Sequence, residues 1–232
     1  MAGKIPKWEA ELWTYVSSGD GEHCPLRSQC GTKLACGWCP DDNKERINQF
    51  LERNEVTPQS CDFIETNIGG QVGRLFLLVE LLALKYLEMG MVRSPPLPTA
   101  LIGLIDEYGI TEVRQVPLKA YHGAIWRPKE GWIIQVRADD TSAMKRFTIF
   151  HEAFHILAHC ARCRTTPVFR KRGAIQGSFN ELLADYFAIC ILAPRRWVRE
   201  NWAEVRDLDR MAEIFDAPKP AMCIRLRILG LV

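Results

Sequence analysis

The sequence predicts an α+β fold that is mainly helical, contains a small antiparallel sheet and follows a helical, cysteine-bearing N-terminal region. Apolar residues recur at helical spacing in most of the long segments. Three short runs with strand character lie close together, between residues 112 and 137. Helices and strands that are segregated along the chain in this way are typical of α+β folds.

The composition is that of a globular protein. The 232 residues are 47% hydrophobic, which is enough to bury one large core, or one core with a small attachment. A formal net charge of +2 does not indicate binding to nucleic acid or to a membrane. The first residues lack the apolar segment of a secretory signal, so we expect a cytoplasmic protein whose nine cysteines are reduced or bound to metal.

Three helices are expected in the N-terminal region. Residues 8–17 place tryptophan, leucine and valine at helical spacing, and residues 41–54 form a polar helix that an aspartate caps. A strongly apolar helix covers residues 72–88. Glu80 and Lys85 interrupt its apolar sequence, which favours a buried helix over a membrane span.

A turn-rich segment between the first two of these helices contains a cluster of thiols, namely Cys24, Cys30, Cys36 and Cys39. Four thiolates in such a loop can hold a structural zinc ion or an iron–sulfur cluster, and His23 is a substitute ligand. Only the pair Cys36 and Cys39 has the spacing of a common metal-binding half-site. Four unrelated reduced cysteines therefore remain the alternative.

The proline-rich stretch at residues 94–98 is the clearest linker in the chain. It predicts a boundary between an N-terminal region, residues 1–94, and a second domain, residues 95–232. A helix over residues 99–107 is expected to open the second domain, because a threonine can cap its start and a glycine follows its end.

The predicted strands cover residues 112–116, 123–126 and 132–137. A turn at residues 128–131 joins the last two as a hairpin. The Asp-Asp-Thr sequence at residues 139–141 then offers side-chain caps for the helix that follows.

That helix contains the motif HExxH. In a helix, His151 and His155 project from one face, one turn apart, which is a spacing that suits a zinc ion. Glu152 lies beside the metal rather than on it, where its carboxylate can take a proton from the attacking water. The rest of the helix is apolar, and burying these polar side chains is costly unless they are paired or bound to metal. The sequence therefore predicts a zinc site.

A hydrolytic zinc site usually has a third protein ligand and an open position for water. His159 is the nearest candidate but lies further along the helix axis, and the glycine and third histidine of a metzincin are absent. On a predicted helix over residues 179–191, Glu181 and Asp185 share one face. Glu181 can bind the zinc ion while Asp185 accepts a hydrogen bond from a ligand imidazole. A carboxylate pair on the surface is the alternative.

The remaining segments are a loop and a helical tail. The arginine-rich residues 161–178 are expected to form a solvated loop that could also border the site. The helix after it stops at Pro194, and residues 208–229 form two short helices that meet at Ala217 and Pro218.

From about Pro98 onward, the chain resembles the ImmA/IrrE family of zinc metallopeptidases. The resemblance is carried by GAIW, WIIQVR, RFTIFHEAFHILAH, ELLADYFAICILAP, MAEIF and IRLRILGL, in that order. It implies a zincin-like metallopeptidase domain with His151, His155 and Glu181 as zinc ligands and Glu152 as the catalytic carboxylate. It further implies a cytoplasmic protease that cuts helix-turn-helix repressors and so releases mobile-element or stress-response genes.

The chain departs from the pattern of this family in two respects. Phe154 stands where a glycine is common, which narrows the space behind the site. The cysteine-bearing N-terminal region is not part of the usual pattern either.

The resulting hypothesis is a zinc-dependent endopeptidase whose substrate is a protein, namely a helix-turn-helix repressor. Tyr121, His122 and His159 are the candidates for stabilising the oxyanion, and the strand at residues 123–126 offers an edge to the substrate backbone. One alternative is a non-proteolytic, metal-binding regulator that keeps the peptidase fold and binds a protein or DNA partner. Glu152 argues against it, because a structural metal site needs no base. A third hypothesis is a peptidase that acts on general or unfolded protein substrates.

Overall fold

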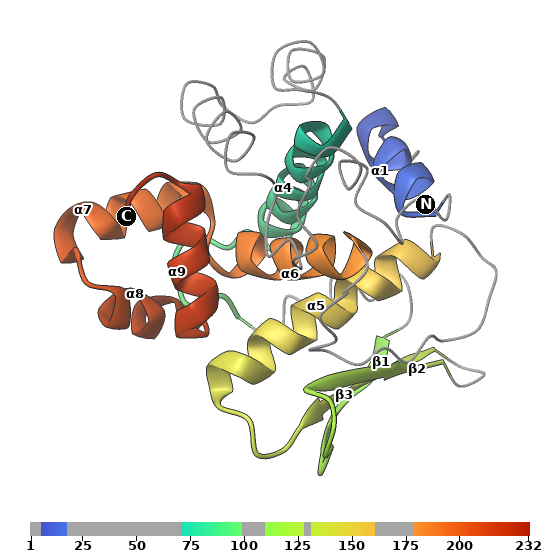
Figure 1. Cartoon of the computed structure of the whole chain (residues 1–232). Coiled ribbons are helices and arrows are strands. Elements are labelled where there is room, and N and C mark those ends of the chain that lie inside the picture. Colours follow the sequence, from blue (N-terminus) through green and yellow to red (C-terminus); the bar gives the residue numbers. More distant parts are fainter. Residues whose placement is uncertain (1–5, 18–70, 99–109, 128–130, 161–178) are drawn as a thin grey trace, which may run out of the picture.

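The computed structural model describes residues 6–17, 71–98, 110–127, 131–160 and 179–232, which form seven helices and one three-stranded sheet (Figure 1). The helices are α1 (Lys7–Ser17), α4 (Gln71–Met89), α5 (Ser142–Cys160), α6 (Phe179–Leu192), α7 (Arg195–Val205), α8 (Leu208–Phe215) and α9 (Lys219–Ile228). The strands are β1 (Ile110–Val116), β2 (Gly123–Trp126) and β3 (Trp132–Arg137). This mainly helical α+β architecture confirms the predicted fold class.

The sheet is mixed, with the strand order β1-β3-β2. Strands β2 and β3 form the predicted antiparallel hairpin, in which Gly123 lies opposite Val136. Strand β1 runs parallel to β3, so the expectation of a purely antiparallel sheet is wrong for this strand. The reason is the connection at residues 117–122, which leads from β1 to β2 on the opposite edge of the sheet and leaves β3 between them.

Helix α5 lies between the sheet and α6 (Figure 1). Alternate residues of β3, namely Trp132, Ile134 and Val136, are buried and pack against Ile149 and Ile156 of α5. This alternation is what one buried face of a sheet requires. It fixes the face of α5 that turns toward the strands.

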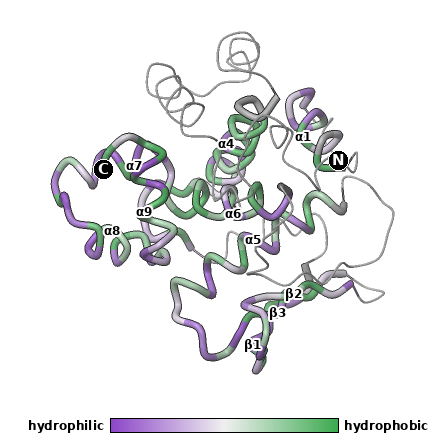
Figure 2. The backbone as a smooth tube through the Cα atoms, viewed as in Figure 1, coloured by the Kyte–Doolittle hydropathy of each residue, from purple (hydrophilic) through white to green (hydrophobic). Residues whose placement is uncertain are grey.

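Helix α6 is the centre of the larger core. Most of its residues are apolar, and residues 183–193 are all buried except Asp185, which is half-buried. It packs on α5, α4 and α9. Figure 2 shows hydrophobic residues concentrated along α4 and α6, whereas hydrophilic residues are frequent along α8. The beginning of α6 is less buried, and this end carries Glu181.

Helices on both sides of the linker at residues 94–98 share one hydrophobic core. Within it, Glu80 of α4 pairs with Arg225 of α9 at 2.6 Å, and both side chains are buried. The division into residues 1–94 and 95–232 stays a prediction. In the described part of the chain, no helix is both long and apolar enough to cross a membrane.

For most predicted elements that lie in the described residues, the predicted bounds agree with the structure to within two residues. These elements include α1, α4, the β2–β3 hairpin, and α8 and α9 of the tail. Helix α7 was not predicted. Pro194 ends α6, but it also lies at the N-cap of α7, whose Val198 and Trp202 are buried. The predicted helices at residues 41–54 and 99–107, and the predicted loop at 161–178, lie outside the described residues.

Candidate metal centre

The residues before α5 fix the start of that helix. The hydroxyl of Thr141 accepts a hydrogen bond from the backbone N–H of Met144 at 3.2 Å, which confirms one of the predicted caps. Asp140 has a different contact, since its carboxylate lies 2.7 Å from Nδ1 of His122.

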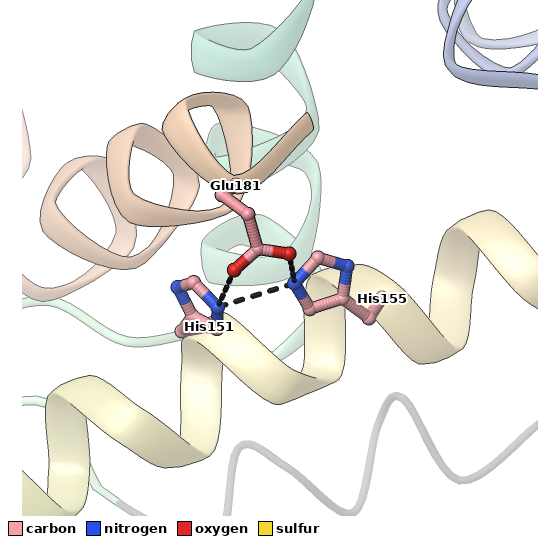
Figure 3. A group of neighbouring side chains, drawn as sticks. All are labelled: His151, His155 and Glu181. Carbon is pink, nitrogen blue, oxygen red and sulfur yellow. Dashed lines mark hydrogen bonds and ion pairs between the residues drawn. The ribbon is translucent and has the colours of Figure 1, made fainter. Parts of the chain in front are cut away.

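Three side chains from α5 and α6 converge (Figure 3). The Nε2 atoms of His151 and His155 lie 3.1 Å apart. The carboxylate of Glu181 reaches both, with Oε2 at 3.4 Å from His151 Nε2 and Oε1 at 3.2 Å from His155 Nε2. In the described part of the chain, this is the one cluster of three or more such side chains that could hold a metal ion.

The spacing and chemistry of these atoms fit a zinc ion. Ligands bound at about 2.0–2.1 Å in tetrahedral geometry lie roughly 3.3–3.4 Å from one another. The two nitrogens are 3.1 Å apart, which is close to this value, and each has a different oxygen of Glu181 at a similar distance, 3.4 Å for His151 and 3.2 Å for His155. Two imidazoles and one carboxylate are also the donor set of many catalytic zinc sites, which leave one position open.

Asp185 determines which nitrogen of His151 faces the centre. Its Oδ1 lies 2.7 Å from Nδ1 of His151. When this carboxylate accepts a hydrogen bond from Nδ1–H, the proton stays on Nδ1 and the lone pair of Nε2 is directed at the other two ligand side chains. His151 is only 2% exposed, so its orientation is fixed by packing as well.

Glu181 is held in the ionised form that metal binding requires. Burial would raise the pKa of its carboxyl, but hydrogen bonds and charge from His151 and His155 outweigh burial and lower the pKa below its ordinary value. The predicted convergence of Glu181 with the two histidines is thus present in the structure, as is the contact of Asp185 with a histidine.

Glu152 faces the sheet and lies against the first residue of β2. A Cβ atom at Gly123 would be 2.6 Å from Oε1 of Glu152 and 2.4 Å from Cγ2 of Thr148. Both distances are far below van der Waals contact, so this position has space for glycine alone. Gly123 was predicted only as the first residue of a strand, although an isolated glycine at a strand is a signal of close approach.

Of the other candidates, only Tyr121 and His122 lie in the described part of the chain. His122 is engaged by Asp140, and the described contacts of Tyr121 and His122 include none with the three clustered side chains. The side chain of His159 lies outside the described residues. So do Cys24, Cys30, Cys36 and Cys39, with His23, and a second zinc ion or an iron–sulfur cluster there stays a prediction.

The profile of the IrrE N-terminal-like domain, peptidase family M78, matches residues 106–227. Among solved structures, a Mycobacterium tuberculosis transcriptional regulator is similar at 17% sequence identity, with a TM-score of 0.47 over 80% of this chain. The chain spans about half of that protein, 52% of its length. No curated protein sequence matches the chain. Because the profile matches more than half of the chain, and its range contains the sheet, α5 and Glu181, the chain belongs to the IrrE N-terminal-like domain family of peptidases.

Proposed function

We propose that the protein is a zinc-dependent endopeptidase that hydrolyses a peptide bond in a protein substrate. The observation that carries the proposal is the convergence of His151, His155 and Glu181 at zinc-ligand spacing. Glu152 follows His151 on the same helix. The peptidase family to which the chain belongs supports the same reaction.

Each residue of the centre has a distinct role in this proposal. When bound by His151, His155 and Glu181, a zinc ion would polarise the substrate carbonyl and acidify the attacking water. Glu152 accepts the proton of that water and later delivers a proton to the leaving amine. Asp185 keeps Nε2 of His151 available, because it accepts a hydrogen bond from the protonated Nδ1 and so fixes the tautomer of the ring.

The geometry of the sheet suits an extended peptide as substrate. Strand β2 pairs with β3 on one side, and none of the described strands pairs with its other side. A substrate segment could add there as a further strand, bonded through its backbone. The resemblance of the sequence to proteases that cut helix-turn-helix repressors makes such a repressor the proposed substrate, and relief of repression the proposed outcome.

The test is incubation of the purified protein with candidate helix-turn-helix repressors, with and without a chelator, followed by mass spectrometry of the products. Cleavage at a defined bond that the chelator abolishes is the expected result. Tight binding of a repressor or DNA without cleavage would favour the non-proteolytic regulator instead. Casein is included in a parallel reaction, because its cleavage would indicate a peptidase that acts on unfolded chains in general.

Glu181 and Asp185 should differ in their effect on metal binding. Glu181→Ala removes a proposed ligand, so we expect loss of the metal. Asp185→Ala leaves all three ligands but frees the ring of His151, so we expect zinc affinity to fall about 10- to 100-fold. Zinc content and chelator competition measure both. If Asp185→Ala lost more affinity than Glu181→Ala, the assigned roles would be reversed.

Gly123→Ala should lower the rate of hydrolysis and leave zinc binding intact. The added methyl group would collide with Glu152 and Thr148, so the carboxylate or β2 must move. A displacement of about 1 Å at a catalytic group can cost roughly 10²-fold in rate. Ala124→Ser is the matched control, because alternate strand residues point to opposite faces and position 124 faces away from α5. Equal rates for the two variants would argue against this role for Gly123.

A further inference from the structure

Helix α1 lies outside the range matched by the family profile, yet it contacts the metal-binding motif itself. The ring of Trp13 lies 5.6 Å from the ring of Phe154, centroid to centroid. Phe154 is fully buried, and it also packs on Phe187 of α6, at a centroid distance of 5.6 Å. Phe154 directly precedes His155 in the chain. The large side chain at this position therefore contacts both α1 and α6.

The end of α1 makes a second contact, at the start of α6. The side-chain amide of Asn180 donates a hydrogen bond to the backbone carbonyl of Val16 at 3.2 Å. This carbonyl is among the last four of α1, which have no partner within their own helix. Asn180 directly precedes Glu181, so the bond joins α1 to the residue before the third ligand of the centre.

Helix α1 is itself firmly attached to α4. Glu9 is only 1% exposed, and its carboxylate lies 2.8 Å from Nζ of Lys85 and accepts a hydrogen bond from Nε1 of Trp13 at 3.4 Å. Leu12 and Trp13 are buried in the same core as α4, α5 and α6. Because these contacts hold α1 in place, α1 can in turn restrict the positions of Phe154 and Asn180.

We propose that α1 positions the metal ligands, through Trp13 on Phe154 of α5 and through Val16 on Asn180 of α6. His155 and Glu181 come from different helices, and each is the chain neighbour of a residue that α1 contacts. Tying both helices to α1 restricts their relative movement and keeps the ligand atoms at binding distance. The inference rests on the proposed zinc site but not on peptide hydrolysis.

The first test compares two asparagines in the full-length chain. Asn180→Ala removes the bond to α1, whereas Asn201→Ala removes an equivalent bond within α7, from the side-chain amide to the carbonyl of Trp197 at 2.8 Å. We expect Asn180→Ala to lower zinc affinity about 10-fold, the lower end of the effect of groups that orient ligands, and Asn201→Ala to leave it unchanged. Competition with a chromophoric chelator measures the affinity. His155→Ala removes one proposed ligand. The zinc-binding step that wild type shows and this variant lacks is therefore the step at this centre.

The second test uses two tryptophans that are almost equally buried, Trp13 at 5% and Trp202 at 7% exposure. Trp13→Leu and Trp202→Leu should both lower the melting temperature, but only Trp13→Leu should lower zinc affinity at a temperature where circular dichroism shows both variants to be folded. Trp13→Phe keeps an aromatic ring against Phe154 and should restore most of that affinity.

Two results would overturn the role of α1: unchanged zinc affinity in both Asn180→Ala and Trp13→Leu, or equal losses in the Trp13 and Trp202 variants. The second result would mean that affinity follows overall stability. A wild-type chain that binds no zinc at His151 and His155 would instead overturn the proposed function.

Discussion

Glu152→Gln is expected to lower peptide hydrolysis by about 10²–10⁴-fold, the usual contribution of a general acid–base group. Glutamine fills the same volume beside Gly123 but cannot accept a proton from water. Glu152 is not one of the three clustered ligand residues, so the variant should retain its zinc and melt close to the wild-type temperature. Initial rates on a cleaved repressor, zinc content and thermal melting measure these three properties.

His155→Ala is the control, because it should lose both zinc and hydrolysis. The pair of variants separates loss of the base from loss of the metal. Wild-type rates in Glu152→Gln would remove the proposed mechanism. If the protein were a non-proteolytic regulator, wild type and Glu152→Gln would bind the partner equally well and neither would cleave it.

Much of the metal centre could be predicted from the sequence because it depends on local geometry. The spacing of His151 and His155 places both on one helix face whatever surrounds the helix. Glu181 lies on another helix, and its assignment required the apolar context and the family resemblance. Gly123 could not be assigned in the same way, because its contact with Glu152 depends on how β2 is placed on α5, and that placement is a tertiary property.

The fold shows the same division between local and distant interactions. The helices and the β2–β3 hairpin follow from periodicity and turn residues. The direction of β1 does not, because the residues of a short strand read alike in parallel and antiparallel pairs. Helix α7 was not predicted because Pro194 indicated only the end of α6. Proline is also common at the start of a helix, and Pro194 is the N-cap of α7.

Glu80 shows most clearly what the sequence could not predict. In the sequence, Glu80 is only a charge that interrupts an apolar helix. In the structure its Oε1 accepts hydrogen bonds from Arg225 at 2.6 Å, Tyr186 at 2.9 Å and Arg195 at 3.3 Å. These partners come from α9, α6 and α7, and Arg225 is 145 residues away in the chain. No local pattern predicts such a pairing.

Glu80→Ala is expected to lower the free energy of unfolding by about 3–5 kcal/mol, because it leaves the guanidinium of Arg225 buried without a counter-charge. Arg225 is only 1% exposed and cannot reach water. Urea denaturation measures the change. Glu213→Ala, which breaks an exposed pair with Arg210, should leave the midpoint nearly unchanged. Glu80→Leu combined with Arg225→Met removes both charges and should recover much of the loss.

The contribution of Glu80 to the free energy of unfolding should also depend on pH, and it should decrease on acidification. Burial would raise the pKa of its carboxyl, but the guanidiniums of Arg195 and Arg225 outweigh burial and hold the pKa below the ordinary value of 4.5. A folded-state pKa below the unfolded one gives stability that is complete above about pH 4.5 and is lost as the pH falls toward the folded value. The difference in unfolding free energy between wild type and Glu80→Ala should therefore be constant near neutrality and shrink below pH 4.5. A difference that grows on acidification would show that Glu80 is protonated in the folded core, where it would act as a neutral hydrogen-bonding group and not as the counter-ion of Arg225.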